Sequence, residues 1–343
     1  MLIAMRQGHN AIVPLVVVAR EPTENSVLTD LSILIVSWNV RPLLERCLFS
    51  LGECHGRDRL SCEVIVVDNA STDGSPEAVR ERFPGVKLIA SDSNLGFTRA
   101  NNVGAAHSSG RYMLLLNPDT EVLGDALSTM VAYMDGHPDV GALGPQLLFP
   151  DLRVQSSRRR FPTLATAVLE STVLQQWFPR NRVLERYYVW DRRENEEQDV
   201  DWVVGACLLI RRQAWEQVGP LDERFFMYSE ELDWCRRLKT AGWRVVYLPS
   251  AAVVHSEGQS SMQVVPARHM YFQSSKVLYF RKHHGALAGE LLRLFLLVTY
   301  GYQLCLEAVK WLVGHKRPLR RERVAAYLRV LRSGLRLRGE VRE

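Results

Sequence analysis

Four short, uninterrupted apolar runs, separated by stretches with helical patterning, constrain the fold of this chain more than any other feature. Uninterrupted apolar runs are typical of parallel strands covered on both faces, whereas half-exposed strands alternate. Strands that alternate with helices build a doubly wound α/β layer. We therefore predict a mixed, mainly parallel sheet with strands at 31–36, 64–67, 86–90 and 113–116, and helices at about 42–51, 75–82, 98–107 and 125–135.

Polar side chains come directly after three of these four predicted strands. In an open parallel sheet, the carboxyl ends of the strands line the crevice where ligands bind. Three polar strand ends at one edge indicate a polar ligand the size of a nucleotide. Gly96 either lets the backbone approach that ligand closely or simply makes a turn. The residues expected at this crevice are Ser37, Asn39, Asp68, Asn69, Asn117 and Asp119, with Asn94, Gly96 and Asn101 beside it.

Asp119 is the best single candidate for a metal ligand. Mg²⁺ and Mn²⁺ prefer oxygen, and their sites often hold only one or two protein carboxylates, completed by phosphates and water. Asn117 is a poorer ligand and is expected to orient a bound group or a metal-bound water. The alternative is that Asn117-Pro118-Asp119 only makes a turn after a strand.

Three carboxylates lie close together at Glu230, Glu231 and Asp233, after an aromatic-rich segment. Apolar surroundings raise the pKa of a carboxylate and suit it to act as a general base. In a helix, Glu230 and Asp233 would share a face and Glu231 would point elsewhere. The alternative is that these acids stabilise a helix N-terminus, where negative charge is favoured. The pattern leaves open which of the three would be the base.

A second structured block is predicted to contain a strand at 202–211, a helix at 212–218, a segment at 225–239 and a strand at 243–248. His255 follows this last strand, in a loop rich in Gly and Ser. A lone His is more often structural than a ligand. Its place after a strand nevertheless favours a second metal ligand or a phosphate contact.

The flanking segments are predicted to be accessory. Residues 1–30 are interpreted as a leader whose order is left open, 151–200 as an insertion or lid, and 263–343 as a helical, basic region. The longest uncharged stretch in the C-terminal region has 13 residues. A bilayer span needs about 20 residues, so docking at a membrane interface is favoured over crossing. Packing on the protein's own core and dimerisation are the alternatives for its apolar face, which consists of Leu287, Leu291, Leu294, Val298, Leu306 and Val309.

The formal net charge of +5 arises from an excess of basic residues near the C-terminus. Residues 316–343 carry ten Lys or Arg against three Glu, whereas the remainder has 33 basic and 35 acidic residues. A basic tail after an apolar helix suggests contact with an anionic membrane surface, and a solvated basic helix without a partner is the alternative. No nucleic acid partner is expected. The six cysteines contain no CxxC pair, which indicates reduced thiols and the cytosol. GxGxxG and GxxxxGK[ST] are missing from the sequence, which argues against dinucleotide oxidoreductases and P-loop enzymes.

Taken in order, six short motifs resemble glycosyltransferase family 2, whose members have the GT-A fold. The rhamnosyltransferase-like branch, which builds cell-surface polysaccharides, is the most similar, and the resemblance covers about 31–261. The motifs are Val36-Ser37-Trp38-Asn39, Val67-Asp68-Asn69-Ala70-Ser71, Asn94-Leu95-Gly96-Phe97, Asn117-Pro118-Asp119, Gly205-Ala206 and Tyr228-Ser229-Glu230-Glu231-Leu232-Asp233.

The resemblance implies an inverting, metal-dependent transfer of a sugar from a nucleotide diphosphate to an acceptor hydroxyl. It places Asp68 at the nucleobase or ribose, and Asp119 at a Mg²⁺ or Mn²⁺ that bridges the diphosphate. Gly205 and Ala206 would shape the floor under the donor sugar and the acceptor. His255 matches a histidine that lies near the metal in some members.

Two departures from the family pattern bear on these roles. Asn117 stands where the family commonly has the first acid of Asp-x-Asp. Glu231 stands at the position of the general base, where the family usually has Asp. Because Glu is one methylene longer, Glu230 and Asp233 stay open as alternatives.

The resemblance also implies partners. A dTDP-linked L-rhamnose is the first expectation for the donor, with UDP-linked hexoses or a galactofuranose as alternatives. The expected acceptor is a glycan or lipid-linked glycan at the cytoplasmic face of the cell membrane. A catalytically silent, membrane-associated scaffold or assembly subunit that keeps the fold is the competing interpretation. The presence of Asp119, Glu231 and His255 together argues against it.

Overall fold

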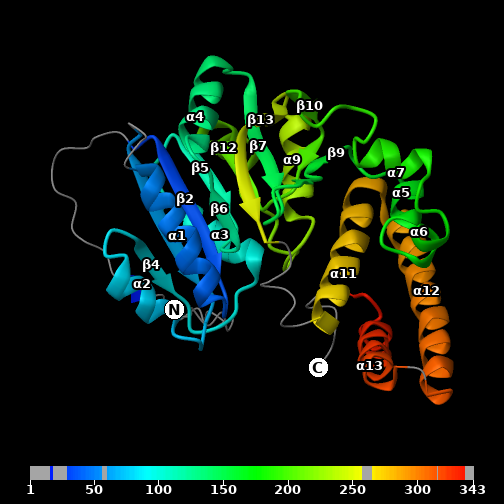
Figure 1. Cartoon of the computed structure of the whole chain (residues 1–343). Helices are drawn as coiled ribbons and strands as arrows, with labels where there is room; N and C mark the ends of the chain where they lie inside the picture. Colours follow the sequence, from blue (N-terminus) through cyan, green and yellow to red (C-terminus); the bar gives the residue numbers. More distant parts are fainter. Residues whose placement is uncertain (1–15, 18–28, 56–59, 257–264, 315, 337–343) are drawn as a thin grey trace, which may run out of the picture.

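A large sheet covered by helices on both faces forms the body of the molecule in the computed structural model, which describes residues 16–17, 29–55, 60–256, 265–314 and 316–336 (Figure 1). Most of the predicted leader and the Gly- and Ser-rich loop after Ser256 therefore lie outside the described residues. The sheet order is β1-β4-β3-β2-β5-β12-β7-β13-β10.

The four strands predicted first form one half of this sheet, and all of them run parallel. β2 (Leu31–Ser37) lies between β3 (Cys62–Asp68) and β5 (Tyr112–Leu116), and β4 (Lys87–Ala90) lies beyond β3. At the outer edge, β1 (Val16–Val17) pairs antiparallel with β4. The predicted helices are observed with ends moved by a few residues: α1 (Arg41–His55), α2 (Ser75–Arg82), α3 (Phe97–Ala106) and α4 (Ala126–Gly136).

The other half of the sheet is mixed. β12 (Cys207–Arg211) runs antiparallel between β5 and β7 (Val140–Leu148), and β13 (Arg244–His255) then pairs parallel with β7. The predicted mixed, mainly parallel sheet is thus confirmed. Three short strands pair with its edges and ends: β6 (Thr120–Val122), β8 (Val154–Gln155) and β10 (Gln198–Val200).

Two predicted strands have different lengths in the structure. The strand predicted at 202–211 is interrupted at 204–206, so that β11 (Trp202–Val203) pairs with β9 (Arg158–Arg159) in a separate two-stranded sheet. The strand predicted at 243–248 continues to His255, because β13 gains a second partner in β6. His255 therefore ends a strand and does not lie in a loop.

The predicted insertion contains three short helices. The apolar stretch at 164–178 forms α5 (Leu164–Leu169) and α6 (Val173–Trp177), and α7 (Arg182–Tyr187) follows. Thr163 and Thr172 cap the first two helices through their hydroxyls, and each cap begins a new helix.

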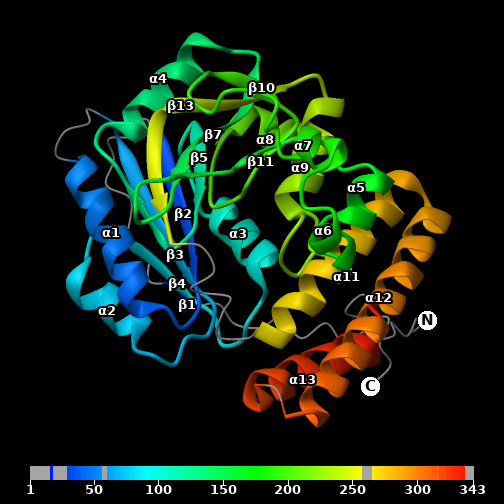
Figure 2. The same ribbon diagram turned by 45° about the vertical axis from the view of Figure 1, so that its right-hand side comes forward.

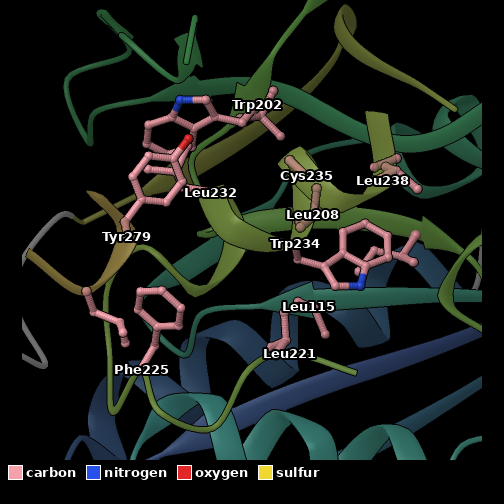
Figure 3. Close-up of a cluster of buried hydrophobic side chains, with 14 of the residues drawn as sticks. Leu115, Trp202, Leu208, Leu221, Phe225, Leu232, Trp234, Cys235, Leu238 and Tyr279 are labelled. Carbon is pink, nitrogen blue, oxygen red and sulfur yellow. The ribbon is translucent and has the colours of Figure 1, made fainter. Parts of the chain in front are cut away.

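Hydrophobic side chains pack on both faces of the sheet. Along β2, Ile33 and Ile35 belong to the cluster under α1 and α4, whereas Leu34 and Val36 belong to the cluster on the opposite face. The second cluster continues under α8 (Arg212–Val218) and α9 (Glu230–Thr240). Figure 3 shows Trp234 of α9 packed in it beside Leu115 and Leu221. This packing fixes the position of the acidic first turn of α9.

Three C-terminal helices lie to one side of the sheet: α11 (Val265–His284), α12 (Ala286–Leu312) and α13 (Arg317–Ser333) (Figures 1 and 2). α11 carries Tyr279 and Phe280 into the same core cluster as the sheet. α12 is long and apolar enough to cross a membrane by composition, with a mean hydropathy of 1.3 over its most apolar window and 28% of that window buried. The 13-residue uncharged stretch therefore understates the apolar length of this helix.

Candidate active site

The carboxyl ends of β2 and β3 bring buried polar groups together. Ser37 pairs in register with Asp68, and their side chains are 0% and 2% exposed. Ser37 Oγ and Asp68 Oδ1 have no hydrogen-bond partner among the described residues. Burial raises the pKa of Asp68, although hydrogen bonds from Ser71 oppose the rise. Buried polar atoms without partners are rare in native proteins, so these two atoms indicate a place for a polar ligand.

Three asparagines that were candidates for the ligand site form hydrogen bonds with the loops around these strand ends. Asn69 Oδ1 accepts from the Leu95 N–H at 2.7 Å, and Asn69 Nδ2 donates to Asn94 Oδ1 at 3.0 Å. Asn39 Oδ1 accepts from the Thr72 N–H at 2.7 Å. These bonds fix the loops after β2, β3 and β4 relative to one another.

Asn101 and Gly96 have local roles in the structure. Asn101 Nδ2 donates to the Phe97 carbonyl within α3 at 2.9 Å. Gly96 has a φ of +84°, and a Cβ there would lie 2.5 Å from the Phe226 ring. Glycine is therefore required at position 96 because the Phe226 ring, and not a ligand, lies close to its backbone.

Asp119 and His255 lie side by side because β13 pairs with β6. The register places His255 opposite Thr120, and His255 Nε2 is 3.4 Å from Asp119 Oδ1. His255 Nδ1 bonds to Gln155 Oε1 at 2.9 Å. Because an amide oxygen can only accept, Nδ1 carries a hydrogen, and Nε2 faces the Asp119 carboxylate. Asp119 Oδ1 has no hydrogen-bond partner among the described residues, so a cation between the two atoms would satisfy both.

Asn117 and Ala206 connect this pair to the central strands. The Asn117 N–H donates to the Ala206 carbonyl at 2.9 Å, because β12 begins beside the end of β5. Asn117 Oδ1 is buried and, within the described parts of the chain, without a hydrogen-bond partner. We call Ser37, Asp68, Asn117, Asp119 and His255 the strand-end cluster.

Glu231 is joined to this cluster through Gly205. The Gly205 N–H donates to the Glu231 carboxyl, and a Cβ on Gly205 would lie 3.3 Å from Glu231 Cγ. Burial raises the pKa of Glu231, while backbone N–H groups and the charge of Arg159 partly offset the rise. Burial, followed by the charge of Glu231, raises the pKa of Glu230 well above its usual value. The interruption between β11 and β12 thus places the Gly205 backbone against Glu231.

The backbone before these acids is strained. Tyr228 and Ser229 have φ values of +68° and +64°, in the left-handed region that non-glycine residues rarely adopt. Ser229 begins α9 without a side-chain cap, and Glu230, Glu231 and Asp233 occupy the first turn. Acidic side chains there are stabilised by the helix dipole. Strain of this kind persists where surrounding contacts hold it, and it clusters at functional sites.

Asp233 has a different environment from its two neighbours. It is 0% exposed and is contacted by two cations and a histidine: Lys282 Nζ lies 2.7 Å from Oδ1, Arg237 Nε lies 3.0 Å from Oδ2, and His283 Nε2 lies 2.7 Å from Oδ1. Burial alone would raise the pKa of Asp233, but hydrogen bonds from His283 and Lys282 bring it below its usual value. Asp233 thus ties α9 to α11 as an ion-paired carboxylate.

A cavity of about 760 Å³ lies between the insertion, the start of α9 and the C-terminal helices. We call it the interhelical cavity. Glu231 lines it, together with Arg159, Lys276 and several aromatic rings. Arg159 lies over the Tyr188 ring, with its Cζ 4.6 Å from the ring centre. Lys276 is paired with Glu170, with its Nζ 2.7 Å from Oε2.

The sequence did not point to the lining of this cavity. Arg159 stands in a run of three arginines within the predicted insertion, and Lys276 belongs to no motif. The one available signal was the density of aromatic residues in the insertion and in 271–280. Aromatic rings are also common in cores, so this signal does not identify a cavity by itself.

Within the described ranges, no group of three or more His, Cys, Asp or Glu side chains is arranged to hold a metal ion. The pair Asp119 and His255 is the most suitable arrangement at the strand ends. Two protein ligands are enough for Mg²⁺ or Mn²⁺ when phosphates and water complete the shell.

Comparisons with known proteins are consistent with this geometry. The family model described as "Glycosyl transferase family 2" matches residues 32–219. An N-acetylglucosaminyl-diphospho-decaprenol L-rhamnosyltransferase of Mycobacterium tuberculosis is 35% identical over 272 residues, covering 75% of this chain and 87% of that protein.

Two solved structures share the fold at low sequence identity. A mannosyltransferase of Pyrobaculum calidifontis, in complex with GDP-mannose and Mn²⁺, is 16% identical, with a TM-score of 0.51 and coverage of 90% of this chain and 86% of that one. GalNAc-T7, with UDP, GalNAc and Mn²⁺, is also 16% identical, with a TM-score of 0.52; the match covers 75% of this chain and 50% of that one.

Proposed function

The chain belongs to glycosyltransferase family 2 and has the GT-A fold, and from this premise we propose that it is an inverting, metal-dependent rhamnosyltransferase that extends a lipid-linked glycan. One observation carries the proposal: a continuous series of contacts joins the strand-end cluster to Glu231. Asp119 contacts His255, Asn117 bonds to Ala206, and the adjacent Gly205 bonds to Glu231. A donor and an acceptor bound at the two ends of this series would be held close enough to react.

The nucleotide would bind at the ends of β2 and β3. Ser37 Oγ and Asp68 Oδ1 are the buried polar atoms there without partners in the described chain, and a base N–H or a ribose hydroxyl would satisfy the carboxylate. The braced loop around Asn69 and Asn94 would keep this site in shape before the donor arrives.

Asp119 and His255 would hold the divalent cation. Asp119 Oδ1 and His255 Nε2 lie 3.4 Å apart, so one ion could contact both atoms. Asp119 is 7% exposed. Mg²⁺ or Mn²⁺ suits a carboxylate ligand combined with phosphate oxygens. When bound, the ion supplies charge that stabilises the departing diphosphate.

Glu231 would be the general base that deprotonates the acceptor hydroxyl. It lines the interhelical cavity, where an acceptor has room, and its raised pKa suits proton transfer near neutral pH. Glu230 is more deeply buried, and Asp233 is neutralised by its cations. In a single in-line displacement, the acceptor oxygen attacks the anomeric carbon, its proton goes to Glu231, and the nucleotide diphosphate leaves from the opposite face.

The donor and acceptor that we propose are taken by similarity from the Mycobacterium tuberculosis relative. That relative's name specifies L-rhamnose as the transferred sugar and a diphospho-decaprenol-linked N-acetylglucosamine as the acceptor. We propose a dTDP-linked donor, a polyprenyl-diphosphate acceptor, and a place of action at the cytoplasmic face of the membrane. Mixed hydroxyl, amide and aromatic groups line the cavity, and this lining is suited to a sugar.

Calorimetric titration of dTDP and UDP, each with and without Mn²⁺, tests the donor site. We expect metal-dependent binding of dTDP to wild-type protein, and a loss of at least about tenfold in affinity in Asp119→Ala, since second-shell changes alone cost that much at metal sites. Asp139→Ala is the matched control, because this carboxylate is exposed and precedes β7 at the opposite end of the sheet. Failure of the wild-type protein to bind either nucleotide would overturn the transferase proposal and favour a silent scaffold.

A further inference from the structure

A continuous apolar stripe runs along the outer face of α12. Its members recur every three or four residues, so they lie on one face of the helix. Val298 is 73% exposed and Leu287 is 74% exposed, values unusual for such side chains on a helix packed in a bundle. The apolar stripe consists of Leu287, Leu291, Leu294, Val298, Tyr302, Leu306, Val309, Leu312 and Val313.

The apolar stripe widens at two places. Trp177, at the end of α6, lies edge-on to Tyr302 with ring centres 6.2 Å apart, and the adjacent Phe178 is 58% exposed. At the far end of α12, Trp311 and Leu319 add exposed apolar surface beside Leu312 and Val313. Figures 1 and 2 show α12 on the outside of the molecule, far from the sheet.

The opposite face of α12 is packed against the protein. Leu292, Leu296 and Tyr300 are buried in the core cluster shared with α11 and α13. Glu307 is 6% exposed and paired with Arg320 of α13, whose Nη1 is 2.8 Å from Oε1. Because α12 packs along this face against α11 and α13, only its outer face is available to a membrane, so α12 is suited to lie on a membrane and not to cross it.

Basic side chains border the stripe where it meets α13. Lys310, Lys316, Arg317 and Arg321 are exposed around the apolar end of α12, and Glu322 is the one exposed acid of α13. Arg329, Arg332 and Arg336 continue the positive charge along α13. Positive charge beside an amphipathic face attracts anionic lipid.

We propose that the apolar stripe is the docking surface for an anionic lipid bilayer, with α12 lying in the plane of the membrane interface. A second copy of the chain fits this surface less well, because it would cover the apolar side chains and supply no counter-charge to the basic border. An anionic membrane satisfies the apolar side chains and the basic border at once.

Docking of this kind would also orient the reaction, and this consequence rests on the proposed function. Tyr300 and Gln303 of α12 and Gln176 of α6 line the interhelical cavity. Their neighbours Tyr302 and Trp177 are exposed on the stripe. A lipid-linked acceptor could therefore keep its chain in the bilayer while its sugar reaches Glu231.

Flotation with vesicles tests the surface using the full chain. At about 0.1 M salt, where charges on a surface still act over about 10 Å, wild-type protein should float with phosphatidylcholine vesicles that contain about 30 mol % phosphatidylglycerol, and much less with pure phosphatidylcholine. Leu291→Glu combined with Val298→Glu should lower partitioning at least about tenfold. Leu152→Glu, at an exposed apolar residue elsewhere, is the matched control and should bind as wild type.

The charge requirement is tested by Arg317→Glu combined with Arg321→Glu, with Arg153→Glu as the exposed control. The first variant should lose the preference for anionic vesicles, and the control should keep it. Equal flotation of the stripe variant and wild type, or a wild-type dimer in sedimentation that Leu291→Glu with Val298→Glu dissociates, would overturn the proposal. Calorimetric dTDP binding, measured on the same variants, reports the donor site separately, so failure of docking and failure of the proposed function are distinguishable.

Discussion

The strand-end cluster and the interhelical cavity are built in different ways, although they meet at Gly205. In the strand-end cluster, Ser37 and Asp68 are placed by neighbouring parallel strands whose register brings their carboxyl ends together. The interhelical cavity instead takes its walls from the insertion, from α9 and from the C-terminal helices, which are separate segments of the sequence. The first kind of site follows from local sequence pattern, whereas the second depends on tertiary packing.

Glu231→Gln should produce the largest effect and would sharpen this comparison. Removing the proposed general base should lower kcat by about 10³-fold, within the range for acid–base catalysis, while calorimetric dTDP binding is unchanged. Glu230→Gln is the matched control and should cost far less. Equal losses in the two variants would mean that the base assignment is wrong.

The pH dependence of the wild-type enzyme checks the same residue. Glu231 acts as a carboxylate, and burial raises its pKa, so kcat/KM should fall as the pH is lowered from neutral. The fall should occur at a higher pH than the ordinary Glu pKa of about 4.3. A profile flat down to about pH 4 would contradict the assignment.

Asp233→Asn should have the next largest effect, on stability. It removes the carboxylate that Arg237, His283 and Lys282 share, although Lys282 keeps Asp222 at 2.8 Å, and breaking a buried ion pair costs about 3 kcal/mol of unfolding free energy. Denaturant unfolding measures this loss, and Asp139→Asn, at an exposed pair with Arg244, should cost about 1 kcal/mol or less.

The same carboxylate gives a pH signature. Because the pKa of Asp233 is lowered in the folded protein, its contribution to stability is present above the ordinary Asp pKa of about 3.9 and is lost as the pH falls through the lower folded value. Wild-type stability should therefore decline in acid more steeply than that of Asp233→Asn. Parallel declines would show that Asp233 does not hold α9 against α11.

Among the three substitutions, Gly205→Ala should have the smallest effect. It tests the contact between the strand-end cluster and the interhelical cavity. The new Cβ would lie 3.3 Å from Glu231 Cγ, so the base must move by a few tenths of an ångström. We expect kcat to fall about tenfold with little change in unfolding free energy, because catalysis is sensitive to small displacements. Gly136→Ala, which meets no atom within 4 Å, is the control and should leave kcat as it is.

The half of the sheet that contains β2 to β5 could be predicted from the sequence, because its apolar runs are local patterns. The apolar runs identified β2 to β5 within one or two residues at most ends. The polar residues at their ends, such as Asp68 and Asp119, lie at one edge of the sheet because parallel strands share that edge.

The remainder depends on contacts that no local pattern contains. The strand is interrupted at 204–206, where β11 pairs with β9 in a separate sheet. β13 extends to His255, where its end pairs with β6. Gly96 is required by Phe226, a residue 130 positions later in the chain. The family resemblance supplied the position of Glu231, whereas its partner Arg159 and the cavity wall at Lys276 became visible only in three dimensions.

The contacts of α11 bear on how the molecule unfolds. Ser275 donates to the Met227 carbonyl at 2.8 Å, Lys282 and His283 hold Asp233, and Tyr279 shares a core with Leu115 of the central sheet. Such shared burial makes neighbouring regions cooperative. The C-terminal helices and the sheet should therefore melt as a single unit, and a chain that ended before α11 would lose the support for its acidic turn as well as its apolar stripe.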